Sequence, residues 1–150
     1  MNLQTQWIVG FIDGEGCFRI SINKNSPLAC GYQVLPEFTV TQHKRDIMVL
    51  YALKAYFKCG VVRVNHGDRY CYRVRGFSHL QDIIVPFFEK HKLLTKKRID
   101  FEKFRTVLLM ILRKQHLDPE GLQKIRDIQN TMNRKTYQAD QNLEYFAKIS

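Results

Sequence analysis

The stretch WIVGFIDGEGCF, from Trp7 to Phe18, decides how the rest of the chain can fold. Its first part has the apolar spacing of a helix. That helix contains Gly10 and Gly14 on one face, although glycine inside a helix costs roughly 1 kcal/mol relative to alanine. It then ends on two acids, Asp13 and Glu15, where the helix macrodipole disfavours negative charge. These departures from local rules are typical of a functional site.

The two glycines indicate a close partner for this helix. Small residues four positions apart allow two helix backbones to approach each other. The chain has one such stretch, so the partner would be a second copy, crossing on a two-fold axis. Two Glu15 carboxylates would then converge, which is costly unless a divalent metal neutralises them. Two adjacent metal sites of this kind suit phosphodiester hydrolysis. The plainer alternative is that Asp13 and Glu15 merely end a helix.

After this stretch the apolar period changes to two, which is typical of half-buried strands. The pattern predicts four strands, at Phe18–Asn23, Tyr32–Gln42, Val61–Asn65 and Arg69–Arg75. Helical spacing predicts helices at Leu3–Gly14, Asp46–Lys58, His79–Lys90, Thr95–Arg113 and Glu120–Met132. Strand pairs separated by single helices favour an α+β fold, with one antiparallel sheet and helices on one of its faces.

Local signals suggest where three of these helices begin. Ser78 with Gln81 has the pattern of a capping box, and Thr95 is a candidate cap for the long helix that follows it. Asp118 before Pro119 is a cap and first-turn pair. Pro86 is expected to break the helix in which it lies.

The composition suits a protein that binds a polyanion. Twenty-four Lys and Arg against fourteen Asp and Glu give a formal net charge of +10. No apolar run approaches the ~20 residues of a membrane span, and no targeting signal is recognisable, so we expect an intracellular protein without membrane contact. Four cysteines and five histidines match no zinc spacing, which predicts reduced thiols. We expect one domain over 1–133 and a tail at 134–150 that is a short helix or partly disordered.

The outer face of the predicted sheet is polar and basic. Arginine is suited to guanine and asparagine to adenine, so this face is a candidate DNA-binding surface. An ordinary solvated sheet face is the alternative. The candidate DNA contacts are Arg19, Ser21, Asn23, Lys24, Thr39, Thr41, Arg63, Asn65, Arg69, Cys71 and Arg73.

The segment IVGFIDGEG, Ile8–Gly16, resembles the LAGLIDADG signature of homing endonucleases. Glu15 takes the place of the final Asp of that signature. The positions that match outright are Gly10, Ile12, Asp13 and Gly16. The similarity continues through FTVTQH and LLTKKRIDF and covers about residues 3–133. It implies the α-β-β-α-β-β-α fold of that family, with a saddle-shaped antiparallel sheet.

The resemblance also implies a set of functional roles. Glu15 and the Gly14 carbonyl would ligate Mg²⁺, with Mn²⁺ able to substitute, near two scissile phosphates. Gln42 would order water, and Lys97, with Lys96 as the alternative, would stabilise charge at the phosphate. A homodimer would straddle double-stranded DNA. Its interface would contain Trp7, Gly10, Phe11, Asp13 and Gly14.

The predicted function is therefore a site-specific DNA endonuclease. It would make a staggered double-strand break at a long pseudo-palindromic target by Mg²⁺-dependent hydrolysis. A mobile intron of a chloroplast, a mitochondrion or a prokaryote would encode it. The alternatives are an intron RNA maturase and a catalytically inactive DNA-binding protein of the same fold. Glu15, Gln42 and Lys97 together favour cleavage, because a pure nucleic-acid binder needs none of them.

Overall fold

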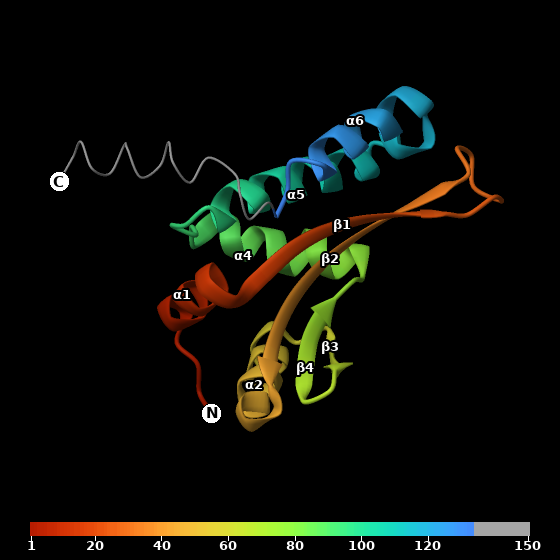
Figure 1. Cartoon of the computed structure of the whole chain (residues 1–150). Helices are drawn as coiled ribbons and strands as arrows, with labels where there is room; N and C mark the ends of the chain where they lie inside the picture. Colours follow the sequence, from red (N-terminus) through yellow and green to blue (C-terminus); the bar gives the residue numbers. More distant parts are fainter. Residues whose placement is uncertain (134–150) are drawn as a thin grey trace, which may run out of the picture.

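The computed structural model describes residues 1–133, and the expected tail at 134–150 lies outside the described residues (Figure 1). The predicted order of helices and strands is confirmed. The main elements are α1 (Thr5–Glu15), β1 (Gly16–Lys24), β2 (Tyr32–His43), α2 (Ile47–Phe57), β3 (Val61–His66), β4 (Arg69–Val74), α3 (Phe77–His79), α4 (Val85–Lys90), α5 (Lys97–Leu112) and α6 (Pro119–Gln129). Short helical turns lie at Lys44–Asp46, Leu80–Ile84 and Gln115–Leu117.

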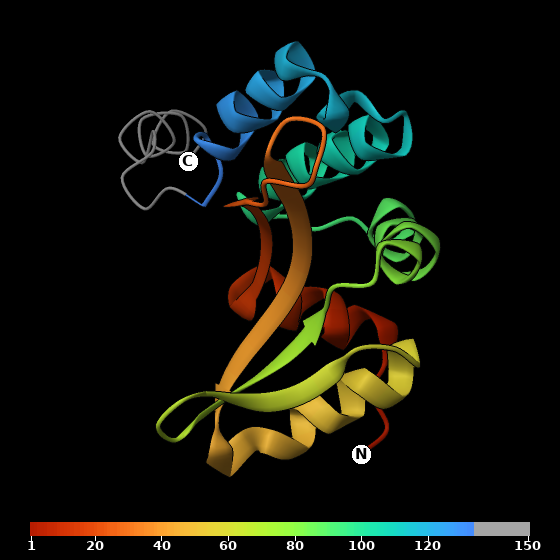
Figure 2. The same ribbon diagram turned by 90° about the vertical axis from the view of Figure 1, so that its right-hand side faces the viewer.

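The four strands form one antiparallel sheet in the order β1-β2-β4-β3, which confirms the predicted α+β class. The long strands β1 and β2 run side by side and curve along the molecule (Figures 1 and 2). Their register pairs Phe18 with Phe38, and Phe38 in turn pairs with Val74 of β4. Alternate residues therefore face the helices, and the residues between them face the concave side.

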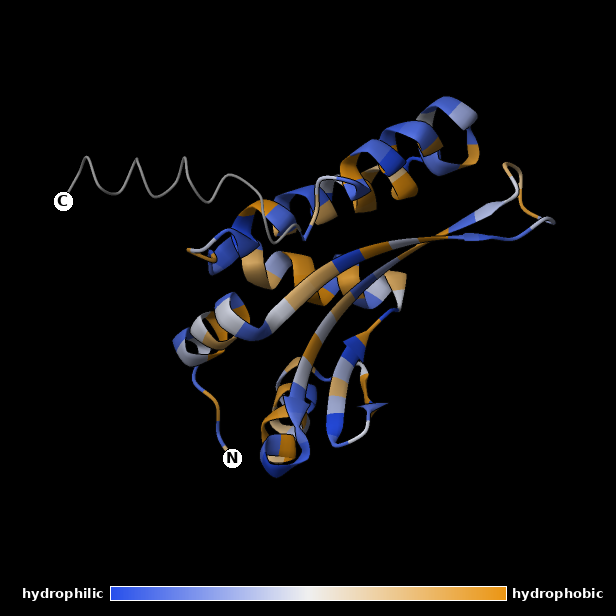
Figure 3. Cartoon of the chain, in the orientation of Figure 1, coloured by the Kyte–Doolittle hydropathy of each residue, from blue (hydrophilic) through white to orange (hydrophobic). Residues whose placement is uncertain are grey.

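An aromatic cluster joins the two long strands to α4 and α5. Phe18 stacks on Phe38 with ring centroids 5.1 Å apart, and its ring lies 5.3 Å from those of Phe101 and Phe104. Phe88 of α4 packs edge-on against Phe18 at 5.6 Å. Figure 3 shows the apolar residues of these strands and helices. Such close aromatic packing holds the start of β1, and with it the acidic end of α1, in a defined position.

The capping box predicted for the third helical segment, at His79–Lys90, is wrong. That segment begins at Phe77, with Gly76 as its N-cap and no side-chain capping bond, so Ser78 lies inside the helix. The break expected at Pro86 is also absent. A wide turn at Leu80–Ile84 precedes Pro86. In this turn a backbone N–H donates to the carbonyl five residues earlier, and the helix then continues through Pro86. This wider turn accommodates a residue that lacks an N–H and crowds the preceding turn.

Of the other two capping predictions, that for Asp118 is confirmed, whereas Thr95 lies one residue before Lys96, the N-cap of α5. The Thr95 hydroxyl accepts the Lys97 N–H at 3.2 Å. The Asp118 carboxylate accepts the Gly121 N–H at 3.3 Å, and Pro119 occupies the first turn of α6. Across residues 1–133, no helix is both long enough and apolar enough to cross a membrane.

Candidate functional site

The acidic end of α1 passes directly into β1 without a loop. The helix includes Glu15, and the Gly16 N–H donates to the Ile12 carbonyl as the strand begins. A Cβ on Gly16 would lie 2.6 Å from the Ile12 side chain and 2.9 Å from its carbonyl oxygen, so this tight junction requires glycine. The junction leaves Glu15 exposed at the end of the helix. Its carboxylate is therefore accessible to a metal or a phosphate-bearing ligand.

Asp13 ties this junction to the start of α5. Its carboxylate accepts the Leu94 N–H at 2.8 Å, the Thr95 N–H at 3.1 Å and the Thr95 hydroxyl at 2.8 Å. These bonds join two segments of the chain that lie 81 residues apart in the sequence. The predicted place of Asp13 in a dimer interface stays a prediction, but the hydrogen bonds of its carboxylate are made within its own chain.

Changing Asp13 to Asn is expected to lower the free energy of unfolding by about 1–3 kcal/mol, because one oxygen that accepts an N–H becomes an NH₂ group. Urea unfolding at a constant m-value would measure the change. Asp127, which accepts the Gln123 amide on the surface of α6, provides the matched control, Asp127→Asn, for which we expect a change within about 0.5 kcal/mol. Equal stabilities of the two variants would contradict the bracing role of Asp13.

Lys97 reaches the same junction from α5. Its Nζ donates to the Gly16 carbonyl, so a positive charge lies beside the residue that follows Glu15. Lys96 lines an adjacent hollow of about 370 Å³. The residues around that hollow are Asp13, Thr95, Lys96, Lys97, Asp100 and Asn133. The structure thus brings the predicted lysines and the acidic helix end together.

Gln42 lies near the end of β2, beside the start of β1. In the sheet register Val40 pairs with Gly16, so Gln42 is two residues beyond this pair and faces the same side as Val40. It pairs with Tyr70 of β4 and is half-buried. Its backbone position therefore places it next to the junction of α1 and β1.

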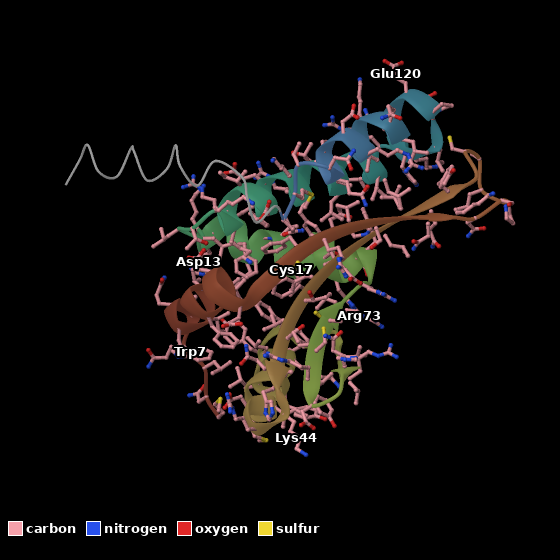
Figure 4. The ribbon with its side chains drawn as sticks, viewed as in Figure 1. Trp7, Asp13, Cys17, Lys44, Arg73 and Glu120 are labelled. Carbon is pink, nitrogen blue, oxygen red and sulfur yellow. The ribbon has the colours of Figure 1, made fainter. Side chains whose placement is uncertain are left out.

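The concave side of the sheet contains a hollow of about 560 Å³, and most of the predicted DNA contacts line it. Its lining residues are Cys17, Arg19, Glu37, Thr39, Thr41, Arg63, Val64, Asn65, Cys71, Arg73 and Arg75. Figure 4 shows Arg73 on β4 and Cys17 at the start of β1. The predicted contacts outside the hollow are Ser21, Asn23 and Lys24, farther along β1, and Arg69, at the start of β4.

Four residues that line this hollow were not among the predicted contacts: Cys17, Glu37, Val64 and Arg75. Arg75 follows the last residue of β4, where the alternation that includes Arg73 would continue by one more step. Glu37 has the right alternation on β2, but an acid is an unexpected choice on a surface for DNA. The predicted strand at Arg69–Arg75 already ended on Arg75, two residues after Arg73 and on the same face, so the signal for Arg75 was present in the sequence.

The electrostatics of this concave face favour an anionic partner. Burial, followed by the charges of Arg75 and Arg63, lowers the pKa of Arg73, although a guanidinium stays protonated at neutral pH. Burial raises the pKa of Cys17 and of Cys71, so both thiols stay neutral. Only one of the residues that line the hollow is an acid, against four arginines. The face is therefore positive, as phosphate binding requires.

The outer face of α1 carries the predicted dimer residues. Trp7 is 45% exposed and stacks on Phe11 with ring centroids 4.8 Å apart. Gly10 and Gly14 are exposed, and a Cβ built on either would meet nothing within 4 Å. The packing of α1 within the described chain therefore does not account for these glycines. The dimer interface stays a prediction.

Metal binding at this junction would use few ligands from one chain. Among residues 1–133 there is no group of three or more His, Cys, Asp or Glu side chains that could hold a metal ion. Mg²⁺ commonly binds through one or two carboxylates together with water and substrate phosphates. The exposed Glu15 carboxylate and the Gly14 carbonyl provide oxygen donors of this kind. They fit a metal shared with DNA better than a closed protein site.

Comparison with known proteins places these features in a family. Residues 8–108 match the family of LAGLIDADG endonucleases. The crystal structure of the homing endonuclease I-TnaI superposes with a TM-score of 0.87 at 53% sequence identity, covering 97% of this chain and 99% of that one. The structure of I-SmaMI bound to uncleaved DNA target in the presence of calcium ions superposes with a TM-score of 0.84 at 33% identity, covering 87% of this chain and 45% of that one.

A curated relative, probable intron-encoded endonuclease 2 from Neurospora crassa, is 31% identical over 127 residues. The aligned region covers 84% of this chain and 26% of the relative. The chain thus spans about a quarter of the length of this relative and of others like it. The signature at the end of α1, the antiparallel sheet and these similarities together show that the chain belongs to the LAGLIDADG endonuclease family.

Proposed function

We propose that this chain is a site-specific DNA endonuclease that acts as a homodimer and makes a staggered break in both strands of a long pseudo-palindromic target. The main support is the junction of α1 and β1. There, an exposed carboxylate on Glu15 and an ammonium group on Lys97, held by the Gly16 carbonyl, lie at the start of the strand that borders the basic hollow.

Double-stranded DNA is the proposed partner of the concave face. The arginines of this face suit phosphates and guanine edges, and a curved sheet can follow a groove. I-SmaMI, a structural relative, is described as bound to a DNA target. Intron RNA is the competing partner, but its binding alone would require neither Glu15 nor Lys97.

In the proposed mechanism, Glu15 and the Gly14 carbonyl would hold Mg²⁺, which activates water and stabilises the leaving oxygen. Lys97 would place its positive charge where negative charge develops on the phosphate, because its Nζ is held beside the junction. The Gln42 amide would orient water by donating and accepting hydrogen bonds. Each role comes from a residue at or next to the junction of α1 and β1.

A homodimer would complete the binding surface. The exposed glycines of α1 allow close approach of a second copy of that helix. The chain covers 45% of the I-SmaMI chain, so two copies would provide a fold of about that length. Each copy would read one half-site, hence the pseudo-palindromic target. A mobile intron is the proposed genetic source, in line with the name of the Neurospora relative.

The test is a cleavage assay on a library of duplex DNA that includes rRNA genes, followed by sequencing of the new ends. We expect staggered ends at one recurring site with Mg²⁺ and no cleavage with EDTA. Absence of Mg²⁺-dependent cleavage, with salt-sensitive DNA binding retained, would overturn the enzyme and favour the inactive DNA-binding protein. Tighter binding to structured intron RNA than to DNA would favour the maturase.

Lys97→Met is expected to slow single-turnover cleavage by about 10–100-fold, because the ammonium beside the scissile phosphate is lost. Affinity for the target should change by only a few fold, since one phosphate contact among several is removed. Lys124→Met, which removes an equivalent charge from the exposed side of α6, is the control. A cleavage rate of Lys97→Met equal to that of the control would assign the catalytic charge elsewhere, with Lys96 as the next candidate.

A further inference from the structure

Three charged residues form a row across the concave face of the sheet. Arg19 of β1 is paired with Glu37 of β2 in the strand register. Phe38 is paired with Val74, so the next step places Arg75, just after β4, beside Glu37. The row therefore runs arginine, glutamate, arginine, and it faces the hollow that would receive DNA.

The acid of this row lies beneath the two arginines. Glu37 is only 6% exposed. Its Oε2 accepts the Arg75 Nε–H at 2.8 Å, and its Oε1 lies 3.7 Å from Nη1 of Arg19. The side chains of Arg75 and Arg19 remain 51% and 63% exposed. Both carboxylate oxygens therefore face arginine side chains, and these side chains are themselves exposed to solvent.

Two roles are open to an acid on a surface for DNA. An exposed carboxylate can accept a hydrogen bond from N4 of cytosine and so read a base directly. A buried one can instead orient its neighbours. Glu37 is buried, and both of its oxygens face arginines, so the second role fits the geometry. A carboxylate paired in this way also adds little repulsion toward phosphates, because its charge is neutralised locally.

Crowding among the arginines gives this orienting role a physical purpose. The positive charges of Arg75 and Arg63 both act on Arg73, and the hollow contains Glu37 as its single acid. Without Glu37, the Arg75 side chain would be repelled by its neighbours and would sample many rotamers. Ordering such a side chain during binding costs free energy that an already ordered one does not lose.

We propose that Glu37 is a positioning residue that sets base specificity through Arg75, by holding its guanidinium ready for one base pair of the target. The hydrogen bond to Glu37 uses Nε and leaves the terminal nitrogens to donate to O6 and N7 of guanine. The inference rests on the proposed function, since it takes double-stranded DNA as the ligand of the concave face.

The experiment selects preferred sequences from a randomised duplex DNA library with full-length protein in Ca²⁺, and compares wild type, Glu37→Gln, Arg75→Ala and the double variant. Arg75→Ala identifies the base pair that Arg75 reads. At that position we expect Glu37→Gln to reduce discrimination by about five- to tenfold, because a charge-assisted bond is replaced by a neutral one. Preferences at positions away from Arg75 and Arg19 should persist, because Glu37 faces both of these arginines. Non-specific affinity should not fall, since the face loses a negative charge.

The double variant should discriminate at that position no worse than Arg75→Ala alone, since Glu37 acts through Arg75. Glu89→Gln is the matched control. It makes the same change on α4, where Glu89 is paired with Arg105 at 3.8 Å, and should leave the whole profile unchanged.

Three results would overturn the inference. An unchanged profile for Glu37→Gln, together with an altered profile for Arg75→Ala, would show that Arg75 reads its base pair without help from Glu37. A uniform loss of discrimination at all positions, together with a lower melting temperature, would show that Glu37 has only a structural role. A lost preference for cytosine at a different position would make Glu37 a direct reader. Selection of no sequence by the wild type would overturn site-specific recognition as a whole, whereas selection without cleavage in Mg²⁺ would overturn only the nuclease.

Discussion

Glu15→Gln is expected to reduce Mg²⁺-dependent cleavage by at least about 10³-fold while leaving target affinity within a few fold. The substitution keeps the size of the side chain and removes the charge that would hold the metal. Glu15 is exposed at the last position of α1, so its replacement should not disturb the core. Loss of an acid from the C-terminal end of a helix slightly favours folding, by roughly 0.3–1 kcal/mol.

Single-turnover cleavage with Mg²⁺, binding with Ca²⁺ and thermal melting would together measure this prediction. Glu120→Gln, on the exposed first turn of α6, is the control for loss of one carboxylate and should cleave as the wild type does. A Glu15→Gln protein that cleaves within tenfold of the wild type would exclude this residue as the metal ligand and make Asp13 the acid to test next.

Gly10→Leu is expected to convert the protein to a monomer and to lower cleavage by at least about 10²-fold, because a bulky side chain would separate the two copies of α1. Within the described chain, a Cβ at this position meets nothing within 4 Å, so the fold itself has room for the change. Leucine is also a better helix former than glycine by roughly 0.8 kcal/mol, so the isolated monomer should melt no lower than before.

Light scattering after size-exclusion chromatography would report the mass, and a melting curve would report the fold. Ala55→Leu adds bulk to an exposed position of α2 and should leave both mass and cleavage unchanged. A Gly10→Leu protein that remains dimeric and active would place the interface on another surface. A variant that fails to fold would show that the packing of α1 within its own chain leaves no room for leucine at position 10.

The elements of this fold follow closely from local sequence. Alternating apolar residues predicted β1 and β2 because a strand directs successive side chains to opposite faces. Asp118 before Pro119 predicted the start of α6 because a cap acts within one turn. The pattern of Ser78 and Gln81 predicted a wrong cap because local capping competes with burial. Leu80 and Ile84 are buried in the core, and the helical segment that contains them begins at Phe77, before Ser78.

Three features of this protein follow from its sequence alone: a helix that ends on acids, a sheet whose strands have an apolar period of two and one basic face, and a signature that resembles that of a nuclease family. Which residues come into contact depends instead on the tertiary structure. Asp13 accepts hydrogen bonds from a segment 81 residues away, Lys97 reaches Gly16 over the same separation, and Glu37 comes to lie between two arginines. Periodicity and capping act over a few residues, whereas these contacts depend on the strand order β1-β2-β4-β3 and on the docking of α5 against β1, which no local pattern encodes.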